Sequence, residues 1–512
     1  SDAANFFAKA LAADPQNPLV NVALGEGYMF EGRYTEALQR FQAAGPAGTR
    51  TTAGKFGLGG ALIATGKTEP GLAQVHQASQ DDPKNPRGLY YGGLASELGS
   101  PPDLEGAAQS YRAALALDRK FLPASLKLAA LMQRQGKPEQ ALAALKEAEA
   151  AGAPPTALQI AYGSALIVAK EPVRAEEIFR KAILATPKEV PAHLGLASAL
   201  ESQGKGEEAR QALEKALTEV PDAVTARERL AALTATLGHK EEAITHYKAA
   251  IATGHAPLST HVAMAKLQLE LGQLEDAQGE LDKVVEENPS TPDALFTLAR
   301  VWEARGELMR AVQEYRRALR FENLPAVQLA LGRALLKMGK EPEAMSSFDA
   351  AASLPDALVE RGKVFYRKGD YDKSLADFGN ATKLNPKDPK AWLGLGLSHD
   401  RLGELDKASE AWTTALKLAP DDAETQYRLG KFELDKGRVK SAVEHLKAAA
   451  ARIPEKADWE AELYFQLGTA EITAGAKPAA LAAFKKYLEV APKDAASRPE
   501  AQRQIVRLGG KN

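Results

Sequence analysis

The sequence predicts an all-α protein in which helix-turn-helix pairs stack into a right-handed α-solenoid superhelix. The first observation is a period of 34 residues that runs through almost all of the 512-residue chain. The second is composition: hydrophobic residues make up 45% of the chain but aromatic residues only 6%, as expected of closely packed helices rather than β-sandwiches. The third is the recurrence of glycine and proline at fixed places in the repeat.

The repeat is clearest when Pro18 is taken as position 1. Position 8 is then Gly or Ala in every copy and position 20 is Ala, Gly or Ser, which lets two antiparallel helices cross closely. Position 24 is bulky, as in Phe179 and Trp412, and fills the space beside the crossing. Glycine at position 15, such as Gly136, ends the first helix in a left-handed turn. Proline at position 32, such as Pro187, ends the second helix.

About fourteen full copies of this repeat account for most of the chain. The part before them predicts the second helix of a truncated repeat, and the part after them predicts a capping helix. The predicted parts are the truncated repeat at 1–17, copies 1–9 at 18–324, copies 10–14 at 325–494 and the capping helix at 495–512.

Two linkers, 321–327 and 353–358, are shorter than the others. Because the linker sets the rotation from one helix pair to the next, we expect the pitch of the superhelix to change between them. The chain begins at Ser1 inside a helical pattern, so we expect it to be a trimmed part of a longer protein.

Composition and motifs exclude several classes of function. The chain has no cysteine, which excludes thiolate metal sites and thiol nucleophiles. Its net charge of −2 argues against nucleic acid as a partner, and no apolar run reaches the roughly 18 residues of a membrane span. Residues 48–56 depart from a phosphate-binding loop in glycine spacing and place Phe56 where Ser or Thr should bind magnesium. We therefore expect no catalytic site, no cofactor and no metal.

The pattern resembles the tetratricopeptide repeat family from end to end. The stretch AWLGLGLSHDRLGELDKASEAWTTALKLAPDD, residues 391–422, matches that family almost position by position. The resemblance implies that positions 2, 5, 9, 12 and 13 of each first helix face a concave groove that binds another protein. Two specialised grooves of the family are excluded, because position 5 never carries the Lys of a carboxylate clamp and position 6 carries no ladder of Asn.

The expected function is therefore a non-enzymatic scaffold or adaptor that binds a partner protein or peptide. Similar bacterial proteins serve in motility, pilus and envelope-export assemblies, and the Cys-free composition slightly favours the periplasmic side of a bacterial envelope over the cytoplasm. One alternative stays open: a glycan-handling or substrate-feeding arm of an enzyme whose catalytic domain lies outside this chain. Aromatic residues at regular intervals along the groove would favour that alternative.

Two sets of groove positions are candidate binding residues. The apolar strip, in the N-terminal half, is expected to bind an amphipathic helix or extended peptide, or else to pack between adjacent first helices. The basic strip, in the C-terminal half, is expected to face an acidic protein surface, or else to be occupied by local ion pairs within each helix. Its stretch from Arg333 to Arg367 is expected to be the least compensated. The apolar strip comprises Leu19, Val22, Met29, Phe30, Phe56, Ile63, Tyr90, Tyr91, Leu94, Leu126, Ile160 and Ile167. The basic strip comprises Arg300, Arg333, Lys337, Lys363, Tyr366, Arg367 and Lys431.

Overall fold

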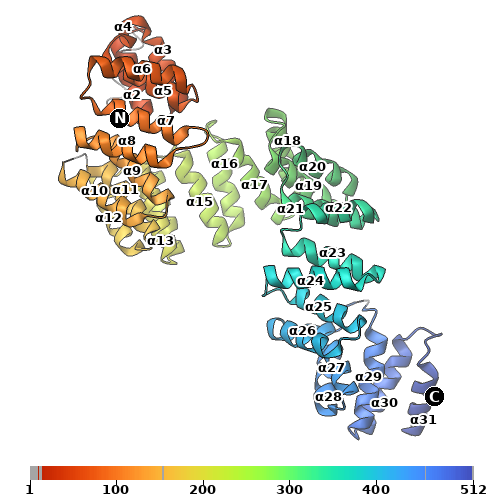
Figure 1. Cartoon of the computed structure of the whole chain (residues 1–512). Helices are drawn as coiled ribbons and strands as arrows, with labels where there is room; N and C mark the ends of the chain where they lie inside the picture. Colours follow the sequence, from red (N-terminus) through yellow and green to blue (C-terminus); the bar gives the residue numbers. More distant parts are fainter. Residues whose placement is uncertain (1–9, 11–13, 31, 153–154, 456, 510–512) are drawn as a thin grey trace. The chain divides into compact units, whose positions relative to one another are not determined.

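The structure is a computed structural model that describes residues 10, 14–30, 32–152, 155–455 and 457–509. In these ranges every regular element is a helix and there is no strand. The chain divides into two compact units, Ser1–Thr260 and His261–Asn512, whose helices are labelled in Figure 1. The predicted helix in 1–17 lies mainly outside the described residues, and the predicted change of pitch between 321 and 358 stays a prediction.

In the first unit the helices alternate as the repeat predicts, with one short addition, α4 (Gly45–Thr49). The first helices of the pairs are α2 (Pro18–Phe30), α5 (Thr52–Ala64), α7 (Pro86–Leu98), α9 (Leu122–Arg134), α11 (Pro155–Val168), α13 (Val190–Ser202) and α15 (Val224–Thr236). The second helices are α3 (Tyr34–Ala43), α6 (Thr68–Asp81), α8 (Leu104–Leu117), α10 (Pro138–Ala150), α12 (Pro172–Ala185), α14 (Gly206–Glu219) and α16 (Lys240–Ile251).

The second unit continues the alternation and ends in the predicted capping helix, α31 (Arg498–Arg507). Helix α17 contains the boundary between the units. The first helices are α17 (Leu258–Glu270), α19 (Pro292–Ala304), α21 (Pro325–Lys337), α23 (Pro355–Lys368), α25 (Pro389–Arg401), α27 (Ala423–Asp435) and α29 (Glu460–Thr473). The second helices are α18 (Leu274–Glu287), α20 (Leu308–Phe321), α22 (Glu341–Ala350), α24 (Tyr371–Leu384), α26 (Leu405–Leu418), α28 (Val439–Ala450) and α30 (Lys477–Val490).

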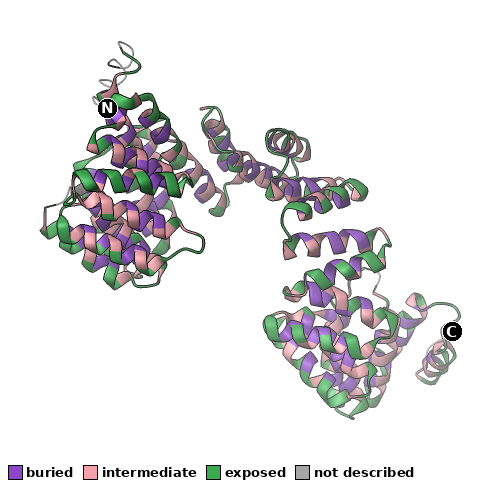
Figure 2. Ribbon diagram, turned by 45° about the horizontal axis from the view of Figure 1, so that its top comes forward, coloured by how far each residue is buried: buried purple, intermediate pink, exposed green. Residues whose placement is uncertain are grey.

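Each pair crosses where the sequence places its small residues. A Cβ atom built on Gly163, at position 8, would lie 2.6 Å from Cζ of Phe179, the bulky residue at position 24. Gly136 ends α9 with a φ of +70°, the left-handed conformation that glycine adopts without strain. The buried sides of the helices face one another, and their exposed sides face outward (Figure 2). The fold is therefore an all-α solenoid of stacked helix pairs.

A hydrogen bond from each of several first helices fixes the linker that precedes it. The donor is the side chain at position 4, and the acceptor is the backbone carbonyl of the proline six residues earlier. Such a carbonyl, just past a helix end, has no partner within the helix. The pairs, donor first, are Asn21 and Pro15, His193 and Pro187, Arg227 and Pro221, Trp392 and Pro386, and Gln426 and Pro420.

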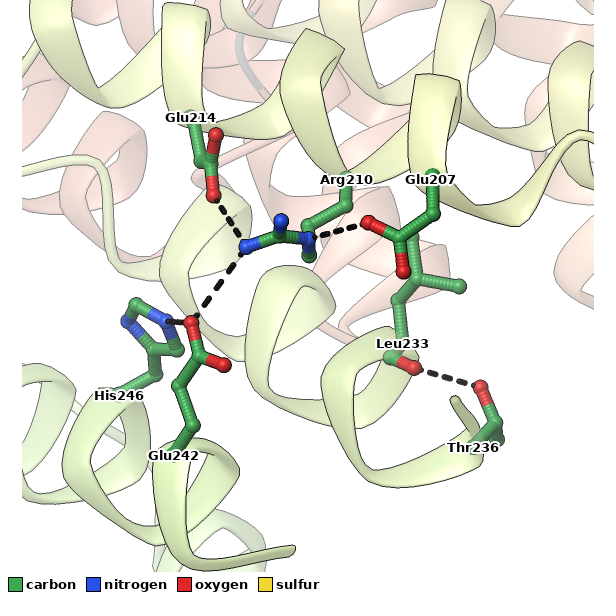
Figure 3. Close-up of polar contacts among 7 residues, drawn as sticks. All are labelled: Glu207, Arg210, Glu214, Leu233, Thr236, Glu242 and His246. Carbon is green, nitrogen blue, oxygen red and sulfur yellow. Dashed lines mark hydrogen bonds and ion pairs between the residues drawn. The ribbon is translucent and has the colours of Figure 1, made fainter. Parts of the chain in front are cut away.

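Ion pairs also join consecutive second helices. Arg210 of α14 contacts Glu207 and Glu214 on its own helix at 2.9 and 2.8 Å, and Glu242 of α16 at 3.5 Å (Figure 3). The hydrogen bond to Glu207 raises the pKa of the Arg210 guanidinium. Nε2 of His246 lies 3.7 Å from Oε1 of Glu242. Because these groups are substantially exposed, each pair contributes at most about 1 kcal/mol to stability.

Candidate binding surfaces

The apolar strip lies on α2, α5, α7, α9 and α11, and its members differ widely in exposure. Phe56 and Ile63 have no exposed surface, so their side chains belong to the core, as in the alternative of packing between adjacent first helices. Leu19 and Phe30 are 74% and 64% exposed. The buried members are Val22, Phe56, Ile63, Tyr91 and Leu94, and the half-buried members are Met29, Tyr90, Leu126, Ile160 and Ile167.

Four half-buried residues at position 5 form a row over one continuous core: Tyr90, Leu126, Ile160 and Leu194, on α7, α9, α11 and α13. The Tyr90 ring is held by aromatic neighbours, with ring centroids 5.1 to 5.7 Å away, and burial raises the pKa of its hydroxyl. Leu194 is absent from the predicted strip, although the repeat register places it in the same row.

The basic strip is more compensated than expected. Arg333 of α21 contacts Asp356 and Glu360 of α23, each at 3.2 Å, and Glu360 also lies 3.7 Å from Nζ of Lys363. The expectation that the stretch from Arg333 to Arg367 is the least compensated is therefore wrong for Arg333, and also for Lys337, which lies 2.7 Å from Glu303. Lys363 has the ion pair within its own helix that was the alternative. The missed carboxylates lie mainly on the neighbouring first helix, beyond the reach of pairs within one helix.

A regular ion pair explains this compensation. A cation at position 9 of one first helix pairs with a carboxylate at position 2 of the next. These pairs, which we call brackets, are Lys266 with Asp293 at 2.8 Å, Arg333 with Asp356 at 3.2 Å, and Lys431 with Glu462 at 3.9 Å.

Two junctions lack the bracket. Arg300 is followed at the next position 2 by Ala326, and it has no ion pair within the described part of the chain. Lys363 is followed by Lys390, a like charge. Arg367 is exposed and also lacks an ion pair there. Tyr366 is half-buried, with its ring centroid 5.5 Å from that of Tyr371, and burial raises the pKa of its hydroxyl.

A cleft of about 330 Å³ lies at the Lys363 junction, between α21, α23 and the start of α25. Four cations line it against three carboxylates. The side chains of Lys387 and Lys390 have no ion pair among the residues that the structure describes. The sequence prediction missed both lysines, although position 2 of the repeat would have identified Lys390. The cationic cleft is lined by Arg333, Lys363, Lys387 and Lys390 together with Asp356, Glu360 and Asp388.

Lys337 is paired in a different arrangement, which occurs once in the described part of each unit. A glutamate at position 12 accepts a hydrogen bond from the tyrosine at position 24 and pairs with a cation at position 13 of the next first helix. Burial is the main cause that raises the pKa of each tyrosine, and the adjacent carboxylate adds to it. In the first unit Glu97 lies 2.7 Å from Tyr111 and 2.7 Å from Arg134. In the second unit Glu303 lies 2.9 Å from Tyr315 and 2.7 Å from Lys337.

Other chemistry is sparse. Within the described ranges, no group of three or more His, Asp or Glu side chains is placed to hold a metal ion. No helix in these ranges is long and apolar enough to cross a membrane.

Family models match more than half of this chain. A model described as TPR repeat matches residues 362–403. A first model described as tetratricopeptide repeat matches residues 126–191, 262–326 and 396–457. A second model with that description matches residues 1–54 and 166–237. A protein from Arabidopsis thaliana named Protein CTR9 homolog is 27% identical over 122 residues, which cover 22% of this chain and 11% of that protein.

Solved structures are also similar. The APC/C hetero-tetramer Cut9-Hcn1 shares 18% identity over 91% of this chain and 92% of the matched chain, with a TM-score of 0.37. YrrB, described as a TPR protein with an unusual peptide-binding site, shares 23% identity over 34% of this chain and 93% of its own, with a TM-score of 0.30. The three family matches and the helix pairs agree with the repeat pattern, and the chain belongs to the tetratricopeptide repeat family.

Proposed function

We propose that this chain is a non-enzymatic scaffold whose first helices bind partner proteins or peptides. Membership of the tetratricopeptide repeat family supports an interaction role, because stacked repeats offer an extended surface. Catalysis favours enclosed pockets that exclude water, and a stack of helix pairs does not build such pockets.

The observation that carries the proposal is the cationic cleft. At this junction Lys363 meets Lys390 where other copies supply a carboxylate. An acidic segment of a partner would supply the missing negative charge, and two lysines without ion pairs, Lys387 and Lys390, are available to it. Contacts of this kind act mainly on association rate and orientation. The half-exposed row of Leu126, Ile160 and Leu194 would add apolar contacts in the first unit.

Charge reversal in the cleft tests the proposal. The full chain is titrated into a fluorescein-labelled, glutamate-rich peptide, and anisotropy is measured at low and at moderate salt. We expect the double variant Lys363→Glu, Lys390→Glu to weaken binding about tenfold or more, since each reversal removes an attraction and adds a repulsion. Wild-type binding should fall with salt, because exposed charges are screened within about 10 Å at 0.1 M.

The matched control is Lys417→Glu, which changes an exposed lysine of α26 that has no ion pair among the described residues. Unchanged affinity in the double variant, or an equal loss in the control, would remove the cleft from the proposal. A separate experiment identifies the partner. Proteins that co-purify with the wild-type chain but not with the double variant would be candidates, and their identity would test the expected bacterial motility, pilus or export context.

A further inference from the structure

A second cleft, of about 810 Å³, lies between the second helices α8 and α10. The first helix α9 forms its floor with Leu128 and Met132, and Arg112 of α8 and Arg119 of the linker between α8 and α9 also line it. Its volume falls within the roughly 300–1,000 Å³ that is usual for ligand sites. An apolar floor with a few polar groups is also typical of such sites. It shares no residue with the apolar strip or the cationic cleft.

The cleft is open because position 4 of its first helix is small. Five other copies place Asn, His, Arg, Trp or Gln at this position and use it to bond a proline carbonyl. Here the position holds Ser125, and the residue six positions earlier is Arg119 rather than proline. Ser125 is 0% exposed, lines the cleft, and its Oγ has no hydrogen-bond partner in the described structure. A buried hydroxyl without a partner is unfavourable, so a ligand group can satisfy it.

The arginines of the wall are free for a similar reason. In the second unit the corresponding residue, Arg316 of α20, pairs with Glu343 of α22, which stands just before position 20. In the cleft the residue before position 20 is Gln140, which lines the opposite wall but carries no charge. Arg112 therefore has no carboxylate partner among the described residues, and its Nη2 lies 4.0 Å from Sδ of Met132.

Arg119 also lacks an ion pair in the described ranges. It lies in the linker after α8, which ends at Leu117, and lines the same cleft as Arg112. The one carboxylate on the walls is that of Glu147. The cleft thus combines an apolar floor, an unsatisfied hydroxyl and two spaced cations.

We propose that this cleft binds an acidic amphipathic helix of a partner protein. Carboxylates of that helix would pair with Arg112 and Arg119, which the single carboxylate of the cleft, Glu147, does not neutralise, and its apolar face would lie against Leu128 and Met132. Ala144 and Ala148 on α10 leave room for a third helix to approach between α8 and α10. A groove between two helices favours a helical peptide over an extended one.

The test uses the full chain and a stapled helical peptide of about 15 residues. The peptide carries Glu at i and i+7 and Leu at i+3 and i+4, and binding is measured by fluorescence anisotropy. We expect Arg112→Glu to weaken binding about tenfold or more, since a charge-assisted bond is replaced by repulsion. Gln140→Glu should weaken it comparably, because the new carboxylate can occupy Arg112 as Glu343 occupies Arg316.

Arg320→Glu is the matched control, because Arg320 is an exposed arginine of α20 without an ion pair among the described residues. Its affinity should equal that of the wild type, and a peptide with Lys in place of Glu should not bind. Binding that survives both Arg112→Glu and Gln140→Glu would overturn the proposal, as would no binding at all. Equal or tighter binding of an unstapled extended acidic peptide, or of dodecanoate, to the chain that carries Lys363→Glu and Lys390→Glu would overturn the helical occupant, because the cationic cleft does not contribute in that variant.

Folding is checked by circular dichroism and by binding of the glutamate-rich peptide at the cationic cleft. A variant that keeps its helix content and its binding of the glutamate-rich peptide has lost only the binding function of the second cleft. Failure of this proposal is therefore separate from failure of the proposed function.

Discussion

Replacing Glu97 by Leu should loosen the junction between α7, α8 and α9, because this carboxylate joins all three helices. Tyr111 is fully buried and donates its hydroxyl to Glu97, so the variant strands a buried donor, at a cost of about 1–3 kcal/mol. The lost ion pairs with Arg134 and with Lys127, which lies 3.6 Å from Glu97, together add at most about 1 kcal/mol. We expect a total of about 1–4 kcal/mol.

The assay is native-state hydrogen exchange of the amides in α7, α8 and α9, because a repeat stack opens locally and one global free energy of unfolding does not describe it. Glu97→Leu is compared in the wild-type chain and in Tyr111→Phe. Without the tyrosine hydroxyl no donor is stranded, so the same change should cost only about 1 kcal/mol. Glu97→Gln keeps an acceptor for Tyr111 and should cost about 1 kcal/mol or less.

Equal costs of Glu97→Leu in the two backgrounds would refute the reasoning, because the hydrogen bond would then carry no coupling. The second unit offers an independent repetition. Glu303→Leu should show the same dependence on Tyr315→Phe, with faster exchange confined to α19, α20 and α21.

Three further outcomes follow from the packing and the charges. Gly163→Leu should unfold its helix pair at a lower urea concentration than the wild type, because the new Cβ would lie 2.6 Å from Phe179 and overpacking costs about 1–3 kcal/mol. Gly279→Leu is the control: its Cβ has open space around it, so the urea concentration of unfolding should not change. Partial burial acts to raise the pKa of Glu176, but hydrogen bonds from neighbouring amide and cationic side chains lower this pKa below 4.5 overall. The stability that ionised Glu176 provides is therefore fully present above pH 4.5 and is lost as the pH falls through the lowered pKa. The difference in urea stability between wild type and Glu176→Gln should therefore shrink below pH 4.5, and a difference that does not change with pH would contradict this. Leu126→Ser should weaken a partner bound along the row without altering the helix content measured by circular dichroism, because the side chain is half-buried rather than in the core.

The helix pairs could be predicted because their determinants are local. Gly163 and Phe179 lie on adjacent helices, and the close approach that the repeat implies is present between them. The turn at Gly136 likewise needs only its own positive φ. Helix α4 could not be predicted in this way, because its sequence, GPAGT, consists largely of poor helix formers.

The surfaces were harder to predict because their partners come from neighbouring repeats. Arg333 pairs with Asp356, which is 23 residues away and therefore invisible to a search for pairs three or four residues apart. Burial of Phe56 depends on how tightly consecutive first helices approach, which the apolar pattern of one helix does not specify. Leu194 and Lys390, in contrast, stand at repeat positions already identified, so a comparison of equivalent positions across copies would have found them.

The two clefts arise from separate departures from the repeat. Where a bracketing carboxylate is present, as for Lys266 with Asp293, the cation is paired between neighbouring first helices. At the cationic cleft Lys390 takes the place of that carboxylate. At the second cleft Gln140 takes the place of the glutamate that pairs with Arg316 in the second unit, and Arg112 has no ion pair among the described residues. An exposed ion pair contributes at most about 1 kcal/mol, whereas the small residue at position 8 and the bulky residue at position 24 hold the pair together. A repeat chain can therefore lose individual brackets at little cost in stability, and each loss leaves a charged group available to a partner at one defined junction.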